Sequence, residues 1–179
     1  LHWPGRAATA LTAVAALLPQ CCLGMLLLSV RRSEGDRGLQ RIPAGATLTI
    51  QQGVTVRLNP GVRITVNGTL KAVGTSTDSI RFIPDIPNTH WNNITFKNTI
   101  SPTLQYCLFE GTEKVAVRKR DDLEDMFGAL NFGLDTDFDG ISDCTFRNSV
   151  SGAIFIGSNL ASDVTIKNCI IKDGQNFGI

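Results

Sequence analysis

The sequence has few histidines, the residue that most often transfers protons in catalytic centres. It contains two histidines, His2 and His90, and neither has the acidic and nucleophilic neighbours of a Ser-His-Asp set. A Gly-rich phosphate-binding loop is also missing. Lys and Arg number 17 and Asp and Glu number 16, so the net charge is +1 and no large basic face is expected. These absences argue against hydrolytic triads, phosphate-loop proteins and general nucleic-acid binders.

Paired Cys-x-x-Cys motifs and zinc-ligand spacings are absent too, although the chain has five cysteines. Cys21 and Cys22 lie in an apolar N-terminal run, whereas Cys107, Cys144 and Cys169 recur at one place in a repeated phrase. We expect these three to face inward as small hydrophobic side chains. A disulfide between neighbouring turns is the alternative, because stacked strands lie about 4.8 Å apart.

The repeated phrase occupies residues 104–111, 141–148 and 166–173. It consists of an aliphatic residue, two variable residues, Cys, any residue, Phe or Ile, a charged residue, and then Asn, Asp or Gly. In an extended chain the Cys and the apolar residue two positions later face the same side, and the final residue favours a turn. The cysteines of the last two copies lie 25 residues apart and those of the first two lie 37 apart. A period in the twenties with strand phrases in each unit is typical of a solenoid, and no helical period of 3.6 appears.

The first 41 residues differ from the remainder. Residues 7–30 form a run of 24 without charge, followed by Arg31 and Arg32. The run is long enough for a membrane-spanning helix and also fits the core of an export signal. If the run were an anchor, the arginines after it would favour a cytoplasmic location for that flank, which conflicts with an extracellular solenoid. This conflict favours a cleaved signal or a gene-prediction artefact. We expect residues 1–41 to be this leader plus a linker, and residues 42–179 to be one domain truncated at its C-terminus.

From Ile42 onward, short apolar alternations are separated by Gly or Pro-Gly. The runs are Gly45-Ala-Thr-Leu-Thr-Ile, Val66-Asn-Gly-Thr-Leu-Lys-Ala-Val-Gly, Ile80-Arg-Phe and Trp91-Asn-Asn-Ile-Thr-Phe. The order of these elements resembles the opening turns of right-handed parallel β-helix proteins. Two groups share it: secreted or surface-attached bacterial β-helix proteins, and large animal proteins similar to the bark beetle septate-junction proteins. The resemblance implies an extracellular, mostly non-enzymatic scaffold.

We therefore expect an all-β, right-handed parallel β-helix of about six turns, at roughly 23 residues per turn. Residues 113–127 carry charges of both signs and explain the longer interval of 37, so they are expected to form a projecting loop. The segment Trp91–Asn98 is similar to the repeated phrase, with Ile94 in the place of the Cys. Trp91 itself is expected in the core rather than as a platform for a sugar.

An acidic run is the strongest candidate for a metal site. The side chains concerned are Asp135, Asp137, Asp139 and Asp143, at alternate positions or nearly so. Hard carboxylate oxygens next to a Gly can surround calcium, although Phe146 stands where an EF-hand loop needs its Glu. An ordinary acidic turn is the alternative. Some β-helix glycosidases use clustered aspartates, which makes a carbohydrate-active enzyme the second functional hypothesis.

Two further features bear on function. Asn67 and Asn93 begin glycosylation sequons, which matter if the chain is eukaryotic and exported. Asn98, Asn148 and Asp173 share the position after a strand, where stacked side chains can satisfy turn backbone groups.

The leading functional prediction is a non-enzymatic structural or adhesion module, extracellular or at the cell surface, within a cell-junction ectodomain. It would contact a protein or a glycan, not nucleic acid, and it needs no cofactor unless calcium binds. The alternatives are the polysaccharide hydrolase or lyase and a bacterial surface passenger domain.

Overall fold

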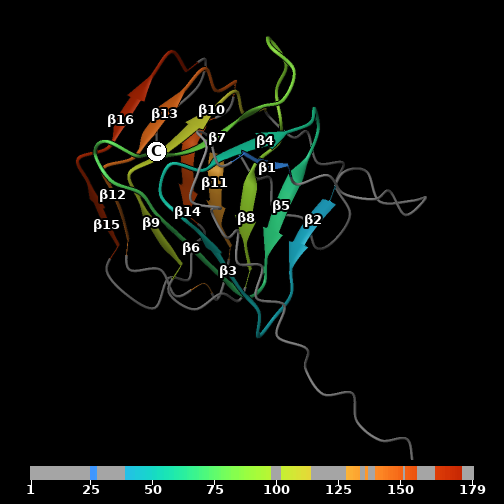
Figure 1. Ribbon diagram of the computed structural model, residues 1–179, viewed down its shortest axis with the longest axis vertical. Helices are drawn as coiled ribbons and strands as arrows, with labels where there is room; N and C mark the ends of the chain where they lie inside the picture. Colours follow the sequence, from blue (N-terminus) through green and yellow to red (C-terminus); the bar gives the residue numbers. More distant parts are fainter. Residues whose placement is uncertain are drawn as a thin grey trace, which may run out of the picture.

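The strands form three parallel sheets that the chain visits in rotation (Figure 1). The structure is a computed structural model, and it describes residues 25–27, 39–97, 102–113, 128–133, 136, 140–150, 152–156 and 164–174. Within this part of the chain, each strand pairs with the strand three places before or after it. The chain is therefore a parallel β-solenoid, as the repeated phrase predicts.

Sheet A has six strands: β1 (Met25–Leu27), β4 (Thr55–Leu58), β7 (Ile80–Pro84), β10 (Cys107–Glu110), β13 (Thr145–Arg147) and β16 (Ile170–Lys172). Each copy of the repeated Cys phrase begins in a strand of sheet C and ends in one of the last three strands of sheet A. Sheet B has five: β2 (Leu39–Ile42), β5 (Arg63–Val66), β8 (Ile94–Phe96), β11 (Gly128–Phe132) and β14 (Gly152–Ile156). Sheet C also has five: β3 (Thr47–Ile50), β6 (Thr69–Val73), β9 (Thr103–Gln105), β12 (Gly140–Ser142) and β15 (Thr165–Lys167).

The number of turns is smaller than the sequence period suggested. From β2 to β14 the chain returns four times to sheet B, and β15 and β16 add part of another turn. The described residues thus contain about four turns rather than six. Right-handed winding stays a prediction. Residues 114–127, which make up most of the expected projecting loop, lie outside the described part of the chain.

Strands also occur before Ile42, where the domain was expected to begin. β2 starts at Leu39, and β1 lies inside the apolar leader and pairs in parallel with β4, with Leu26 opposite Val56. The other leader residues lie outside the described ranges. No helix in the described part of the chain has the length and apolar character needed to cross a membrane.

In-register parallel pairing arranges the core in columns of equivalent side chains. In sheet A, Val56, Phe82, Phe109 and Phe146 occupy successive positions of one column. The Phe82 and Phe109 ring centroids lie 5.0 Å apart, and those of Phe109 and Phe146 lie 5.1 Å apart. Each such ring contributes about 2–3 kcal/mol by leaving water, and stacking adds to this. The Phe of the repeated phrase is thus the central side chain of the core.

The second inward position of the phrase belongs to cysteine, as expected. Cys107 and Cys144 are buried, Cys169 is half-exposed at the end of the column, and all three are free thiols. The Sγ atom of Cys107 donates to the carbonyl oxygen of Ala72 at 3.3 Å, and contact with Cys144 together with burial raises the pKa of the Cys107 thiol. The inward packing is confirmed for the two buried residues, and the disulfide alternative is not formed.

The segment beginning at Trp91 is not a further copy of the Cys phrase in space. Its strand, β8, belongs to sheet B, where Phe96 stacks on Phe132 with centroids 4.7 Å apart. Side chains alternate between inward and outward with a period of two in the strands of both sheet A and sheet B, so the apolar sequence pattern is the same in the two sheets. The expected equivalence of Ile94 to the cysteines was therefore wrong.

Candidate binding groove

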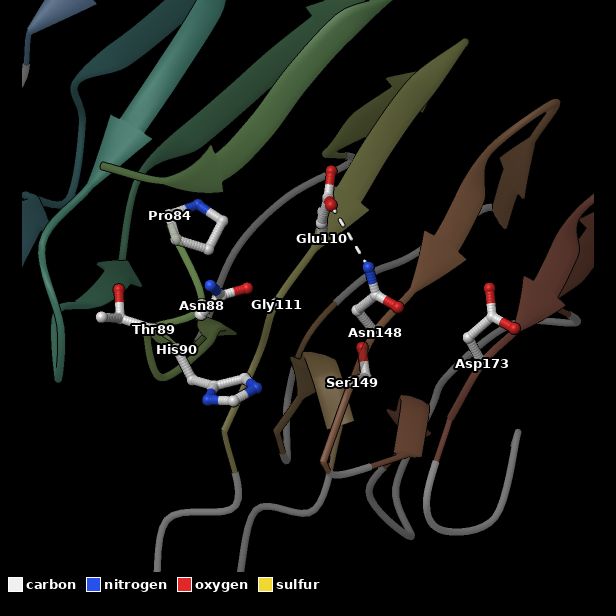
Figure 2. A pocket seen from close by; sticks show the side chains of 9 residues that line it. All are labelled: Pro84, Asn88, Thr89, His90, Glu110, Gly111, Asn148, Ser149 and Asp173. Atoms are coloured by element: carbon white, nitrogen blue, oxygen red, sulfur yellow. Dashed lines mark hydrogen bonds between the residues drawn. The ribbon is translucent and has the colours of Figure 1, made fainter. Parts of the chain in front are cut away.

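A groove of about 400 Å³ follows the carboxyl ends of four neighbouring strands of sheet A (Figure 2). Most of its surface-lining groups are amides, carboxylates, hydroxyls and an imidazole rather than apolar side chains. The lining residues are Pro84, Asn88, Thr89, His90, Glu110, Gly111, Asn148, Ser149 and Asp173. The groove therefore runs across turns, from the loop after β7 to the corner after β16.

The register of sheet A places the equivalent corner residues next to one another. Glu110 is opposite Arg147, and Arg147 is opposite Lys172. The residues that follow each of them, Gly111, Asn148 and Asp173, consequently stand at the same corner of three successive turns, and all three have a left-handed backbone. Their φ values are 69°, 53° and 56°. Gly, Asn and Asp are the residues that adopt this conformation most readily, which explains the last position of the repeated phrase.

Gly111 is needed for a second reason. A Cβ atom at this position would lie 2.6 Å from Cγ of Pro84 and 3.1 Å from its Cδ. The end of β7 can approach the next turn this closely because residue 111 has no side chain. The result is a shallow wall formed by Pro84, Asn88 and Thr89 on one side of the groove (Figure 2).

Glu110 is held by two groups of the next turn. Its Oε2 atom lies 2.7 Å from Nη2 of Arg147, and its Oε1 atom accepts a hydrogen bond from Nδ2 of Asn148 at 3.3 Å. The side chains of Glu110 and Arg147 are 23% and 34% exposed. Because the pair is partly exposed, its net contribution to stability is at most about 1 kcal/mol. Its larger effect is to fix the Glu110 carboxylate and to offset its charge.

Hydrogen bonds between turns hold the residues beneath these side chains in place. The hydroxyl of Thr112 donates to Oγ of Ser149 at 2.8 Å, and both residues are buried. Trp91, also buried, donates from Nε1 to the Glu110 carbonyl at 2.7 Å and from its backbone N–H to the Gly111 carbonyl at 3.0 Å. The prediction that Trp91 belongs to the core is confirmed. Its indole supports the groove from below.

A second polar column lies at the corner between sheets C and A. Oδ2 of Asp143 accepts from Nε2 of Gln105 at 3.3 Å, and Oδ1 accepts from Nδ2 of Asn168 at 3.1 Å. These hydrogen bonds, that of Asn168 first, hold the pKa of the Asp143 carboxyl below its usual range. The three side chains belong to three successive turns, so the column ties neighbouring turns together at their exposed edge.

This column bears on the acidic run proposed to bind calcium. Asp135, Asp137 and Asp139 lie outside the described residues, whereas Asp143 has both carboxylate oxygens engaged by amides. Within the described ranges, no three His, Cys, Asp or Glu side chains come together as ligands for a metal ion. Calcium binding by the run stays a prediction.

The two sequon asparagines occupy different environments. Asn67 is half-buried in the turn between β5 and β6, and its backbone N–H donates to the carbonyl of Ile42 at 2.8 Å. Asn93 is fully buried, and its Oδ1 accepts a hydrogen bond from the hydroxyl of Thr95, the other polar residue of the sequon, at 3.1 Å. Glycosylation stays a prediction at both positions, and Asn67 has the more accessible side chain.

The sequence predicts part of the groove only. It placed Asn148 and Asp173 at one structural position, while Asn98 lies outside the described residues. It does not predict His90 as a groove residue, because the position of His90 depends on residues 84–90 packing against Gly111. No local sequence pattern indicates that contact. The opposite charges of Glu110 and Arg147 at the same place in two copies of the phrase were a usable signal.

Comparison with known proteins identifies no relative of this chain. No family model matches the chain, and no curated protein or solved structure matches it.

Proposed function

We propose that the chain is a non-enzymatic structural and adhesion module of the cell surface or extracellular space. In this proposal the stacked turns supply a stiff support, and the corner groove after sheet A is the contact surface for a protein or glycan. The observation that supports it best is the groove itself, which crosses four turns and whose floor is fixed by hydrogen bonds between turns. A preformed surface of this kind loses little conformational entropy on binding.

The resemblance of residues 42–179 to right-handed β-helix repeats of animal septate-junction proteins and of bacterial surface proteins supports the same proposal. The proposal includes right-handed winding, export and membership of a junction ectodomain. The apolar leader would direct export, and a glycan at Asn67 would agree with that route.

The carbohydrate-active enzyme is the weaker hypothesis on two specific grounds. Glycoside hydrolysis needs one carboxyl group whose pKa is raised so that it can act as an acid. The pKa of Asp143 is instead lowered by its amide hydrogen bonds, and Glu110 of the groove is ion-paired with Arg147. The environment of Asp143 therefore disfavours a protonated carboxyl at neutral pH.

Expression of the full chain with a C-terminal epitope tag in animal cells tests the proposal. We expect the tag in the medium or on non-permeabilised cells, and we expect beads coated with the secreted chain to adhere to cell monolayers more than albumin-coated beads do. A chain that remains in the cytosol, or coated beads that adhere no better than albumin, contradicts it. A heat-treated sample shows whether adhesion needs the folded solenoid.

A further inference from the structure

We propose that the groove after sheet A binds a neutral, polyhydroxylated glycan chain laid along the solenoid axis. This inference deepens the proposed function and rests on it, because it names the class of ligand that the contact surface takes. It is carried by the length of the groove, the chemistry of its lining and the charge balance at Glu110.

The length of the groove matches an extended ligand. Its lining residues come from the ends of β7, β10, β13 and β16, which are consecutive strands of one sheet. Three intervals between parallel strands, each about 4.8 Å, give roughly 14 Å along the axis. A compact metabolite would contact one or two turns, whereas an extended chain several units long can contact all four.

The chemistry of the lining matches vicinal hydroxyl groups. Asn88 and Asn148 each offer an amide that both donates and accepts, Asp173 offers two acceptor oxygens, and His90 offers a ring nitrogen of each kind when neutral. Figure 2 shows the side chains of His90, Asn148 and Asp173 distributed along the groove, one for each of three turns. A sugar hydroxyl is likewise both donor and acceptor, so a row of such side chains can hydrogen-bond successive sugar units.

The charge balance favours a neutral glycan over a basic peptide or a polyanion. The Glu110 carboxylate is already paired with Arg147, and Asp173 contributes a second carboxylate to the lining. An anionic chain would meet these two carboxylates, and a cationic chain would have to compete with Arg147 for Glu110. A neutral chain avoids both costs, since it replaces water at polar groups without separating an ion pair.

The test is isothermal titration calorimetry of the full chain with three neutral hexasaccharides, cellohexaose, xylohexaose and mannohexaose. The groove variants are Asn148→Gly, Asp173→Gly and His90→Ala. Glycine is chosen at 148 and 173 because both residues have positive φ, so the side chain is removed without backbone strain. Asn168→Gly is the matched control, because Asn168 has φ 54° at the other corner and does not line the groove.

We expect at least one hexasaccharide to bind, and each groove variant to weaken binding about fivefold, the effect of losing one hydrogen bond of about 1 kcal/mol. Asn168→Gly should leave the affinity unchanged. Absence of binding by all three probes at millimolar concentration overturns the inference, as does equal weakening by Asn168→Gly. Preferential binding of a Lys- and Arg-rich peptide, titrated in parallel, would overturn it in favour of a protein ligand.

The outcomes separate the two proposals. A chain that is exported and adhesive but binds no hexasaccharide overturns the glycan inference alone. A chain that binds a hexasaccharide through the groove but is neither exported nor adhesive contradicts the proposed module function alone.

Discussion

Replacing Phe109 with Ala removes the central ring of the Phe82–Phe109–Phe146 stack. Phe109 is fully buried, and its ring centroid lies 5.0 Å from that of Phe82 and 5.1 Å from that of Phe146. Truncation of a buried Phe costs about 3–5 kcal/mol, and the two lost ring contacts place this site at the upper end of the range. Because a domain of this size has a total stability of about 5–15 kcal/mol, we expect a large fall in the urea midpoint.

Ile171→Ala is the matched control for this prediction. Ile171 occupies the same column, opposite Phe146, but is 39% exposed. Its truncation should cost about 1–2 kcal/mol, less than that of Phe109, because more than a third of the residue already contacts water. Urea unfolding monitored by circular dichroism gives both values. Equal effects of the two substitutions, or a cost below about 1 kcal/mol for Phe109→Ala, would refute the proposed stacked core.

Two further predictions concern the corners. Gly111→Ala should cost about 2 kcal/mol or more, because φ is +69° and a Cβ would lie 2.6 Å from Cγ of Pro84. Gly45→Ala, with φ +77° and open space around it, should cost about 1 kcal/mol. Similar urea midpoints for the two variants would contradict the close approach of Pro84 to Gly111. The Asp143 pKa is lowered, chiefly by Asn168, so its stabilisation is present above the unfolded carboxyl pKa of about 4 and is lost as pH falls through the lower folded pKa. The stability difference between wild type and Asp143→Asn should therefore shrink on acidification from about pH 5 to below the folded pKa, and a difference that grows would show that the sign is wrong.

The core of the fold could be predicted from the sequence because its rule is local. A Cys and a Phe two residues apart must face the same side of a strand, and copies at a regular interval must stack when strands pair in parallel. Phe109 and Phe146 follow this rule and are buried in one column. The third copy follows it only in part: Ile171 is in register but exposed at the end of the described sheet.

The assignment of strands to sheets could not be predicted in the same way. Ile94 and Phe96 alternate like the Cys phrase, yet they belong to sheet B, because periodicity records which side a residue faces and not which sheet it joins. The number of turns was overestimated for a related reason: the spacing of the Cys phrases, 25 or 37 residues, gives no fixed number of residues per turn.

The groove depends on contacts between segments far apart in the sequence. The repeated phrase indicates that Asn148 and Asp173 share a corner, but it gives no information on the loop that brings His90 beside Gly111. Likewise, Asp143 was singled out as a carboxylate for calcium, while its partners Gln105 and Asn168 become visible only when three turns are stacked. The register between strands, rather than any one motif, determines which side chains meet at such corners and can contact a ligand.

The most direct test of the stacked register is a nuclear Overhauser spectrum of the full chain with isotopically labelled phenylalanine. We predict ring-to-ring contacts between Phe82 and Phe109, between Phe109 and Phe146, and between Phe96 and Phe132. Contacts of Phe109 with neither neighbour, or with Phe96 in place of Phe82, would contradict the parallel three-sheet solenoid and the groove that depends on it.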